Sequence, residues 1–302
     1  MTARNRRARA KEPILSMGKA DRNRNQSARA RIAAQQAAQR KAEQRRRIIL
    51  LGGITVVLLA VIGVIIGVAL NSSKPKQATA TTGPLPASVQ SDLKVPASTL
   101  AKVGIGSALP SALRPGSGAV LTSGGKPEML YIGAEWCPYC AAERWAMAVA
   151  LNRFGSFSPL KGIHSSATDV YPNTATLTFY QAKYTSQYVV FDPVENEDIN
   201  HNLLEKPTPA QQAIWNKYDP SNGYPFINFG NRLIAGTTYD PQVLHGLTWS
   251  QIAADLHNPS SPVAQGVDGS ANLFTAAICK LTGNAPADVC TAAPVSTLEG
   301  QI

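Results

Sequence analysis

The chain has 302 residues, of which 44% are hydrophobic and 16% charged, and its formal net charge is +10. Fifteen Lys and Arg side chains against three acidic ones give residues 1–47 a charge of +12, so the remainder carries −2. The high pI therefore describes a tail and gives the rest of the chain no nucleic-acid-binding character. We interpret residues 1–47 as a disordered cytoplasmic tail, with anionic lipid and nucleic acid as alternative ligands.

Residues 48–70 form an uncharged apolar run without proline. As a helix the run would be about 34 Å long, enough to cross the roughly 30 Å core of a bilayer. It is longer than the apolar core of a signal peptide and begins far from the N-terminus, so we expect an uncleaved transmembrane helix. The arginines at 45–47 precede it, which predicts a single-pass protein of the cell membrane with a cytoplasmic N-terminus. The cysteines then lie outside the cytoplasm, where disulfides persist.

Composition divides the rest of the chain into four expected parts. A Ser-, Thr-, Pro- and Lys-containing stretch predicts a linker, and apolar content then returns in segments that are broken by Gly and Pro. The expected parts are a linker at 71–92, an N-terminal extension at 93–119, a main domain at 120–257 and a C-terminal extension at 258–302.

Local patterns in the main domain alternate between strand and helix signals, which predicts an α/β fold. Gly230-Asn231 is a two-residue hairpin signal, and Thr248 with Gln251 has capping-box spacing. The expected elements are helices at 96–103 (with Ser98 as cap), 141–154, 209–218 and 248–256, and strands at 129–132, 176–180, 188–191, 226–229 and 232–236.

The motif Cys137-Pro138-Tyr139-Cys140 lies between the strand at 129–132 and the helix at 141–154. A thiol at a helix N-terminus faces the positive end of the helix dipole, which favours the thiolate. Such sites lower a cysteine pKa from about 8.5 to roughly 3.5–7.5. Because the thiolate attacks disulfides, we predict that Cys137 is the nucleophile and that Cys140 resolves the mixed disulfide.

Residues 134–140 resemble the active-site approach of the thioredoxin superfamily, and Pro138-Tyr139 is the dipeptide of glutaredoxins. The resemblance covers residues 120–257, with a loop-rich insertion, and implies a thioredoxin-like fold. It implies a cis-proline at Pro225, opposite the dithiol. By the same resemblance, the residues that contact substrate are Trp136, Pro138, Tyr139, Tyr224 and Pro225.

One departure from thioredoxin concerns proton transfer. The family has a buried aspartate six positions before its first cysteine, where this chain has Tyr131. That aspartate assists proton transfer when a disulfide is reduced, so its absence favours an oxidase or isomerase over a reductase. Glu135 is an alternative proton carrier.

The chain also resembles the membrane-anchored prokaryotic family called domain of unknown function 929. The segments that carry this resemblance are 126–128, 133–145, 164–166 and 171–174. It extends from about residue 95 to the C-terminus, and it implies no substrate.

The remaining pair, Cys279 and Cys290, is expected to form a disulfide outside the cytoplasm. It either staples the C-terminal segment or relays electrons to Cys137, and we favour the staple. A zinc site needs ligands at closer spacing than these four cysteines provide, so no metal is expected. No nucleotide-binding motif occurs, and no cofactor is expected.

These patterns together predict a membrane-anchored thiol–disulfide oxidoreductase that acts on extracytoplasmic proteins and exchanges electrons with a further dithiol protein. The alternative is a thioredoxin-fold module of the cell envelope that binds partners without catalysis.

Overall fold

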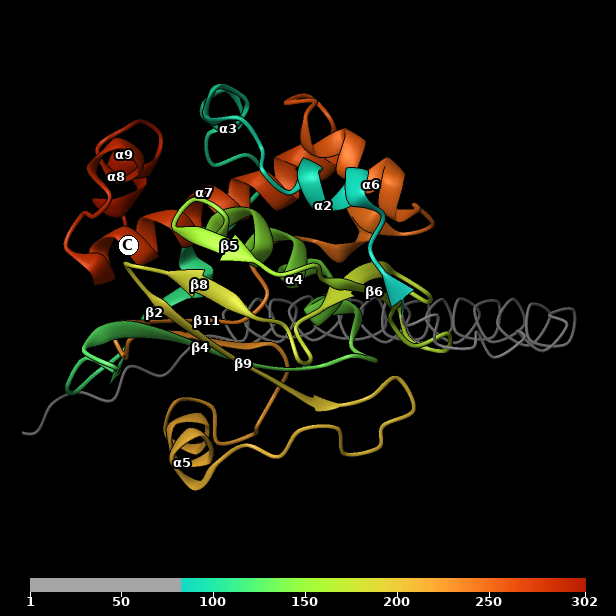
Figure 1. Ribbon diagram of the computed structural model, residues 1–302, viewed down its shortest axis with the longest axis horizontal. Coiled ribbons are helices and arrows are strands. Elements are labelled where there is room, and N and C mark those ends of the chain that lie inside the picture. Colours follow the sequence, from blue (N-terminus) through green and yellow to red (C-terminus); the bar gives the residue numbers. More distant parts are fainter. Residues whose placement is uncertain (1–82) are drawn as a thin grey trace, which may run out of the picture. The chain divides into compact units, whose positions relative to one another are not determined.

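The structure is a computed structural model and describes residues 83–302 (Figure 1). The predicted tail, the predicted transmembrane segment at 48–70 and most of the predicted linker lie outside the described residues. Between Gly83 and the C-terminus, no helix is both long and apolar enough to cross a bilayer.

A mixed sheet forms the centre of the described domain, and β4 (Lys126–Ala134) is its central strand. On one side β4 pairs in parallel with β9 (Val190–Glu197), and on the other it pairs antiparallel with β10 (Phe226–Phe229). The sheet continues through β11 (Leu233–Ala235) to β2 (Leu113–Pro115), and β3 (Thr122–Ser123) pairs with the start of β4. The predicted α/β class is confirmed.

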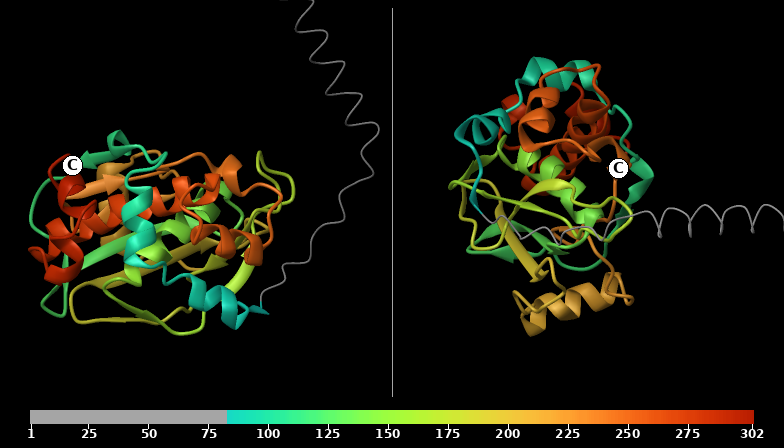
Figure 2. Two further views of the ribbon diagram at one scale, coloured as in Figure 1. Left: turned by 90° about the horizontal axis from the view of Figure 1, so that it is seen from above. Right: turned by 90° about the vertical axis from the view of Figure 1, so that its right-hand side faces the viewer.

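Helices cover both faces of this sheet, namely α4 (Pro138–Leu151) and α7 (Pro262–Thr282) on one face and α5 (Pro209–Tyr218) on the other (Figure 1). Successive strand residues point to opposite faces. Met129 and Tyr131 accordingly join the larger core with α4 and α7, whereas Leu130 and Ile132 join a smaller core between the sheet and α5. The right-hand view of Figure 2 shows α5 below the sheet and the C-terminal helices above it.

Elements with a local sequence signal are confirmed. Helix α5 has the predicted bounds, and α6 (Trp249–Leu256) begins with the predicted Thr248–Gln251 capping box. At the β10–β11 hairpin, Gly230 and Asn231 both have positive φ, +59° and +61°, as a type I′ turn requires. Helix α3 (Ala97–Val103) also forms, but Ser98 is not its cap, because the helix already includes that residue.

The predicted linker and insertion contain more structure than expected. Helix α2 (Ala87–Asp92) lies in the predicted linker, and it buries Val89 in the larger core. The insertion after α4 contains four short strands rather than loops alone, and with β1 from the predicted linker they form two small sheets, β1–β6–β7 and β5–β8. Their strands are β1 (Gly83–Pro84), β5 (Gly155–Phe157), β6 (Lys161–His164), β7 (Ala175–Thr178) and β8 (Tyr184–Ser186).

Both expected extensions contribute to the same packed structure. The N-terminal one supplies β2, an edge strand of the central sheet. The C-terminal one supplies α7, which begins at the Ser261 cap and ends at Gly283 in the left-handed conformation. The remaining short helices are α8 (Ala287–Cys290), α9 (Val295–Glu299) and the 3₁₀ turns at Pro110–Ala112 and Pro241–Leu244.

Candidate active site: a dithiol at a helix N-terminus

The dithiol lies where β4 ends and α4 begins, as predicted. Cys137 is the N-cap of α4, and its sulfur accepts a hydrogen bond from the backbone N–H of Cys140 at 3.2 Å. The helix begins at Pro138, three residues before the predicted start, because proline lacks an N–H and fits the first helical position. Both cysteines are reduced and buried, and Cys137 is 3% exposed.

The two thiols differ in their tendency to ionise. A hydrogen bond from the Cys140 thiol, the Cys140 backbone N–H and the charge of Arg144 lower the pKa of Cys137 against the effect of burial. Burial raises the pKa of Cys140 well above its usual range, and its hydrogen bond to Cys137 adds to this rise. Of the two thiols, Cys137 therefore ionises first, and Cys140 is the one that holds its proton more strongly.

A buried ion pair lies directly behind the dithiol. Arg144 follows Cys140 by one helical turn on the same face of α4. Its Nε and Nη2 donate to the Glu195 carboxylate on β9 at 2.8 and 2.6 Å, and both side chains are inaccessible to solvent. Arg144 Nη2 also donates to the Ala134 carbonyl at 2.8 Å, and the same carbonyl accepts the Cys137 N–H at 3.2 Å. One carbonyl thus couples the guanidinium to the backbone of Cys137.

Tyr131 lies at the position where the resemblance to thioredoxin predicts a buried aspartate, and its side chain cannot act as that carboxylate would. Its ring lies over Gly133, where a Cβ would be only 1.9 Å from the Tyr131 hydroxyl. Burial raises the pKa of Tyr131 well above its usual range, so the hydroxyl cannot accept a proton at neutral pH. Within residues 83–302, neither this hydroxyl nor Arg144 Nη1 has a hydrogen-bond partner.

Glu135, the alternative proton carrier, is buried on the chain segment before the dithiol. Burial raises the pKa of its carboxyl, and a hydrogen bond with Thr178 and the charge of Arg144 oppose that rise. Its contacts therefore link it to the ion pair rather than to solvent.

Trp136 and Tyr224 pack against the cluster formed by Ala134 and the two cysteines. Trp136 Nε1 donates to the Glu197 carboxylate at 2.7 Å, and its ring lies 4.4 Å from that of His201, centroid to centroid. The Tyr224 hydroxyl accepts from Asn196 at 2.5 Å and donates to Glu197 at 3.3 Å. The two aromatic rings are therefore held beside Cys137 by residues at the end of β9 and in the loop that follows it.

The other residues that the resemblance assigns to substrate differ in their placement. The Tyr224–Pro225 peptide is cis, as predicted, and it leads directly into β10. In the described part of the chain, the Tyr224 backbone makes no hydrogen bond and can pair with an incoming strand. Tyr139 is 37% exposed, whereas Pro138 is buried in the first turn of α4 and is shielded from solvent.

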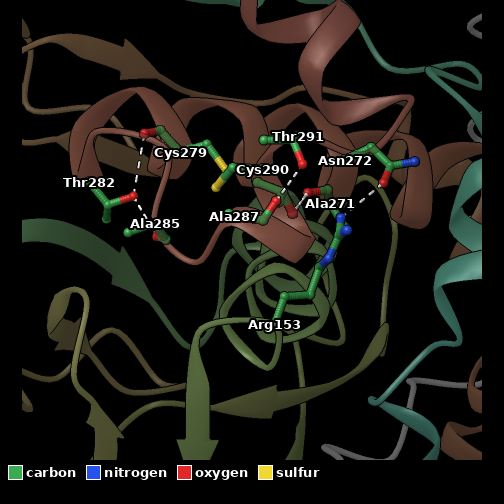
Figure 3. The surroundings of a disulfide bond; sticks show 10 residues. Arg153, Ala271, Asn272, Cys279, Thr282, Ala285, Ala287, Cys290 and Thr291 are labelled. Atoms are coloured by element: carbon green, nitrogen blue, oxygen red, sulfur yellow. Dashed lines mark hydrogen bonds between the residues drawn. A yellow bond between two sulfur atoms is a disulfide. The ribbon is translucent and has the colours of Figure 1, made fainter.

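Cys279 and Cys290 form the predicted disulfide, with their Cα atoms 5.5 Å apart. The bond joins the end of α7 to α8, and both sulfurs are buried. Figure 3 shows it near Arg153, which follows the C-terminal end of α4, whereas Cys137 caps the N-terminal end. A helix of this length spans about 21 Å. That separation favours the staple over the relay, and the staple stays a prediction.

Sequence reasoning missed Arg144 and Glu195. A signal existed for Arg144, since it is a charged residue in the predicted helix at 141–154 and directly precedes the apolar run at 145–151. Glu195 had none, because its role depends on the parallel pairing of β9 with β4. Across the described residues, no group of three or more His, Cys, Asp and Glu side chains is arranged to hold a metal ion.

The chain matches a known protein family. The family described as "Domain of unknown function (DUF929)" matches residues 116–280, more than half of the chain. The match includes the dithiol, Arg144, Glu195 and Tyr224. No curated protein and no solved structure matches the chain.

Proposed function

The chain belongs to the family described as domain of unknown function DUF929, and we propose that it is a thiol–disulfide oxidoreductase acting on protein thiols and disulfides. The observation that carries this proposal is the asymmetry of the dithiol. Cys137 caps α4 with a lowered pKa, while Cys140 keeps its proton. Thiol–disulfide exchange needs one thiolate nucleophile and one resolving thiol, and this pair supplies both.

The site supports the oxidising direction. A stabilised Cys137 thiolate makes the reduced protein more stable, and its disulfide form is then a stronger oxidant. Arg144 contributes to this stabilisation from behind the dithiol. Tyr131 cannot take up the Cys140 proton that a reductase must remove. We therefore propose that the Cys137–Cys140 disulfide is transferred to substrate thiols and that a further dithiol protein regenerates it, without a cofactor.

A thioredoxin-like architecture is part of the proposal. The arrangement that supports it is a parallel β4–α4–β9 unit followed by the antiparallel hairpin β10–β11, with helices on both faces of the sheet. Pro225 lies at the start of β10, which is the neighbour of the strand that leads to the dithiol.

We also propose that the domain works outside the cytoplasm, anchored by the apolar run at 48–70. The disulfide between Cys279 and Cys290 supports this location, since disulfides persist in oxidising compartments. The positive-inside distribution of charge before the run supports the same orientation.

The test is the redox equilibrium of the purified full chain in glutathione buffers, with the state of each cysteine read by alkylation and mass spectrometry. We expect a Cys137–Cys140 potential nearer to about −120 mV, typical of a strong oxidant, than to about −270 mV, typical of a reductant. The Cys279→Ser/Cys290→Ser variant is the control and should give the same potential. Failure of Cys137 and Cys140 to form a disulfide in any buffer would instead favour the non-catalytic interaction module.

A further inference from the structure

Three exposed apolar side chains lie on the dithiol motif or on loops that contact it. Tyr139, Val170 and Leu203 are 37%, 61% and 65% exposed. Among residues 83–302, the other large apolar side chain exposed to this degree is Leu109, on the N-terminal extension. Single exposed apolar residues are ordinary, but three beside one reactive group indicate a contact surface.

Two loops bring these side chains to the dithiol. The first, residues 165–174, is joined to the motif by the Ser166 N–H, which donates to the Trp136 carbonyl at 2.8 Å. Its Tyr171 ring packs against the Tyr139 ring in a T-shaped arrangement, with the ring centroids 6.0 Å apart. Val170, next to Tyr171, therefore borders the motif.

The second loop, residues 197–205, holds the Trp136 side chain through Glu197 and His201. Leu203 follows His201 by two residues and projects into solvent. We call residues 134–140, 165–174 and 197–205 together the dithiol face.

The charge of the dithiol face has one sign. It contains neither Lys nor Arg, and neither does the adjoining turn at 236–245. That turn is joined to the first loop by a hydrogen bond of 3.2 Å from the Tyr171 hydroxyl to Asp240. The acidic residues of these four segments that reach the surface are Asp169, Glu197, Asp198, Glu205 and Asp240, whereas Glu135 is buried. An apolar surface with a negative field is complementary to an apolar segment with positive charge.

We propose that the dithiol face binds extended polypeptide segments in which the reacting cysteines are flanked by apolar and cationic residues. The inference rests on the proposed function and adds its substrate class. Apolar substrate side chains contact Val170, Leu203 and Tyr139, and Lys or Arg side chains approach the carboxylates. Electrostatic complementarity acts mainly on the rate of encounter, so the preference is kinetic and salt-sensitive.

The reaction balances as a two-electron exchange. A substrate thiolate attacks the Cys137 sulfur of the Cys137–Cys140 disulfide, and Cys140 leaves and takes up a proton. The second substrate thiolate then attacks the substrate sulfur of the mixed disulfide and releases the Cys137 thiolate. The substrate dithiol is oxidised to a disulfide and the protein is reduced to its dithiol.

The test uses the full chain, oxidised with oxidised glutathione, and two reduced two-cysteine peptides. One peptide flanks its cysteines with Lys and Leu, the other with Glu and Leu. A neighbouring lysine also makes a peptide thiol more reactive in itself. The rate constant of each peptide with the protein is therefore divided by the rate constant of the same peptide with the uncharged 2-hydroxyethyl disulfide. We expect the normalised rate of the Lys peptide to exceed that of the Glu peptide about tenfold at low salt, and less at high salt.

Two pairs of variants locate the effect. The Asp169→Asn/Asp240→Asn variant should reduce the preference, whereas Asp92→Asn/Glu299→Gln, which removes the same charge away from the dithiol, should leave it unchanged. The Val170→Ser/Leu203→Ser variant should lower the rate constants for the oxidation of both peptides.

Three results would overturn the inference. Equal normalised rates for the two peptides would overturn it and leave the proposed function standing. A chain that oxidises neither peptide would overturn the proposed function as well. If the rate constants for both peptides fall as the protein concentration rises, a second copy of the chain covers the dithiol face, and the proposal fails.

Discussion

The Cys137→Ser variant is expected to reduce the rate of thiol–disulfide exchange by several orders of magnitude, because it removes the thiolate that the site stabilises. The Cys140→Ser variant should have a different effect. The Cys137 mixed disulfide then lacks its resolving thiol and persists as a covalent adduct with substrate. Mass spectrometry of the unreduced full chain, after incubation with a disulfide-bonded protein, identifies the adduct and the cysteine that carries it.

The control for these variants is Cys279→Ser/Cys290→Ser. If the distal disulfide is a staple, this variant exchanges at the rate of the unmodified chain. An adduct on Cys279 or Cys290, or loss of exchange in a control variant that still folds, would support the electron relay and contradict the staple.

The Arg144→Met variant is expected to lower the free energy of unfolding by about 3–5 kcal/mol, since it leaves the Glu195 carboxylate buried without its partner. The same change should raise the pKa of Cys137, because the guanidinium charge that favours its thiolate is lost. Urea unfolding measures the first effect, and the ultraviolet absorbance of the thiolate as a function of pH measures the second.

A second variant separates the two roles of Arg144. The Arg144→Met/Glu195→Gln variant removes both charges of the pair. Its glutamine keeps an oxygen that can accept the hydrogen bond that the Phe179 N–H donates to Glu195 at 3.1 Å. We expect this variant to recover much of the stability and to retain the raised Cys137 pKa. If this variant recovered both the stability and the lowered Cys137 pKa of the unmodified chain, Arg144 would have a structural role alone.

The parts of the fold that were predicted from sequence are those with a local signal. The hairpin turn at Gly230-Asn231 needs positive φ at both positions, and the α6 cap is contained in residues 248–251. The dithiol also has such a signal, because it directly follows the apolar run of β4. The proline after Cys137 marks the start of α4, which the prediction placed three residues later.

The parts that were missed depend on contacts between distant segments. Helix α2 lies in a stretch that is polar in sequence and is stabilised by burying Val89 in the core. Helix α7 had usable boundary signals in Ser261-Pro262 and Gly283, but its core role follows from its packing on α4. The Arg144–Glu195 pair joins residues 51 positions apart, and only the register of β4 with β9 brings them together.

The most direct test of the proposed oxidoreductase is the rate at which iodoacetamide alkylates each cysteine of the reduced full chain as a function of pH. A lowered pKa keeps Cys137 ionised at lower pH, so its alkylation should reach half of its maximal rate below the ordinary cysteine value of about 8.5. Cys140, whose pKa is raised, should remain unmodified over that range. Alkylation of both cysteines with one ordinary pH profile, or no reaction at Cys137 in the folded chain, would contradict the proposal.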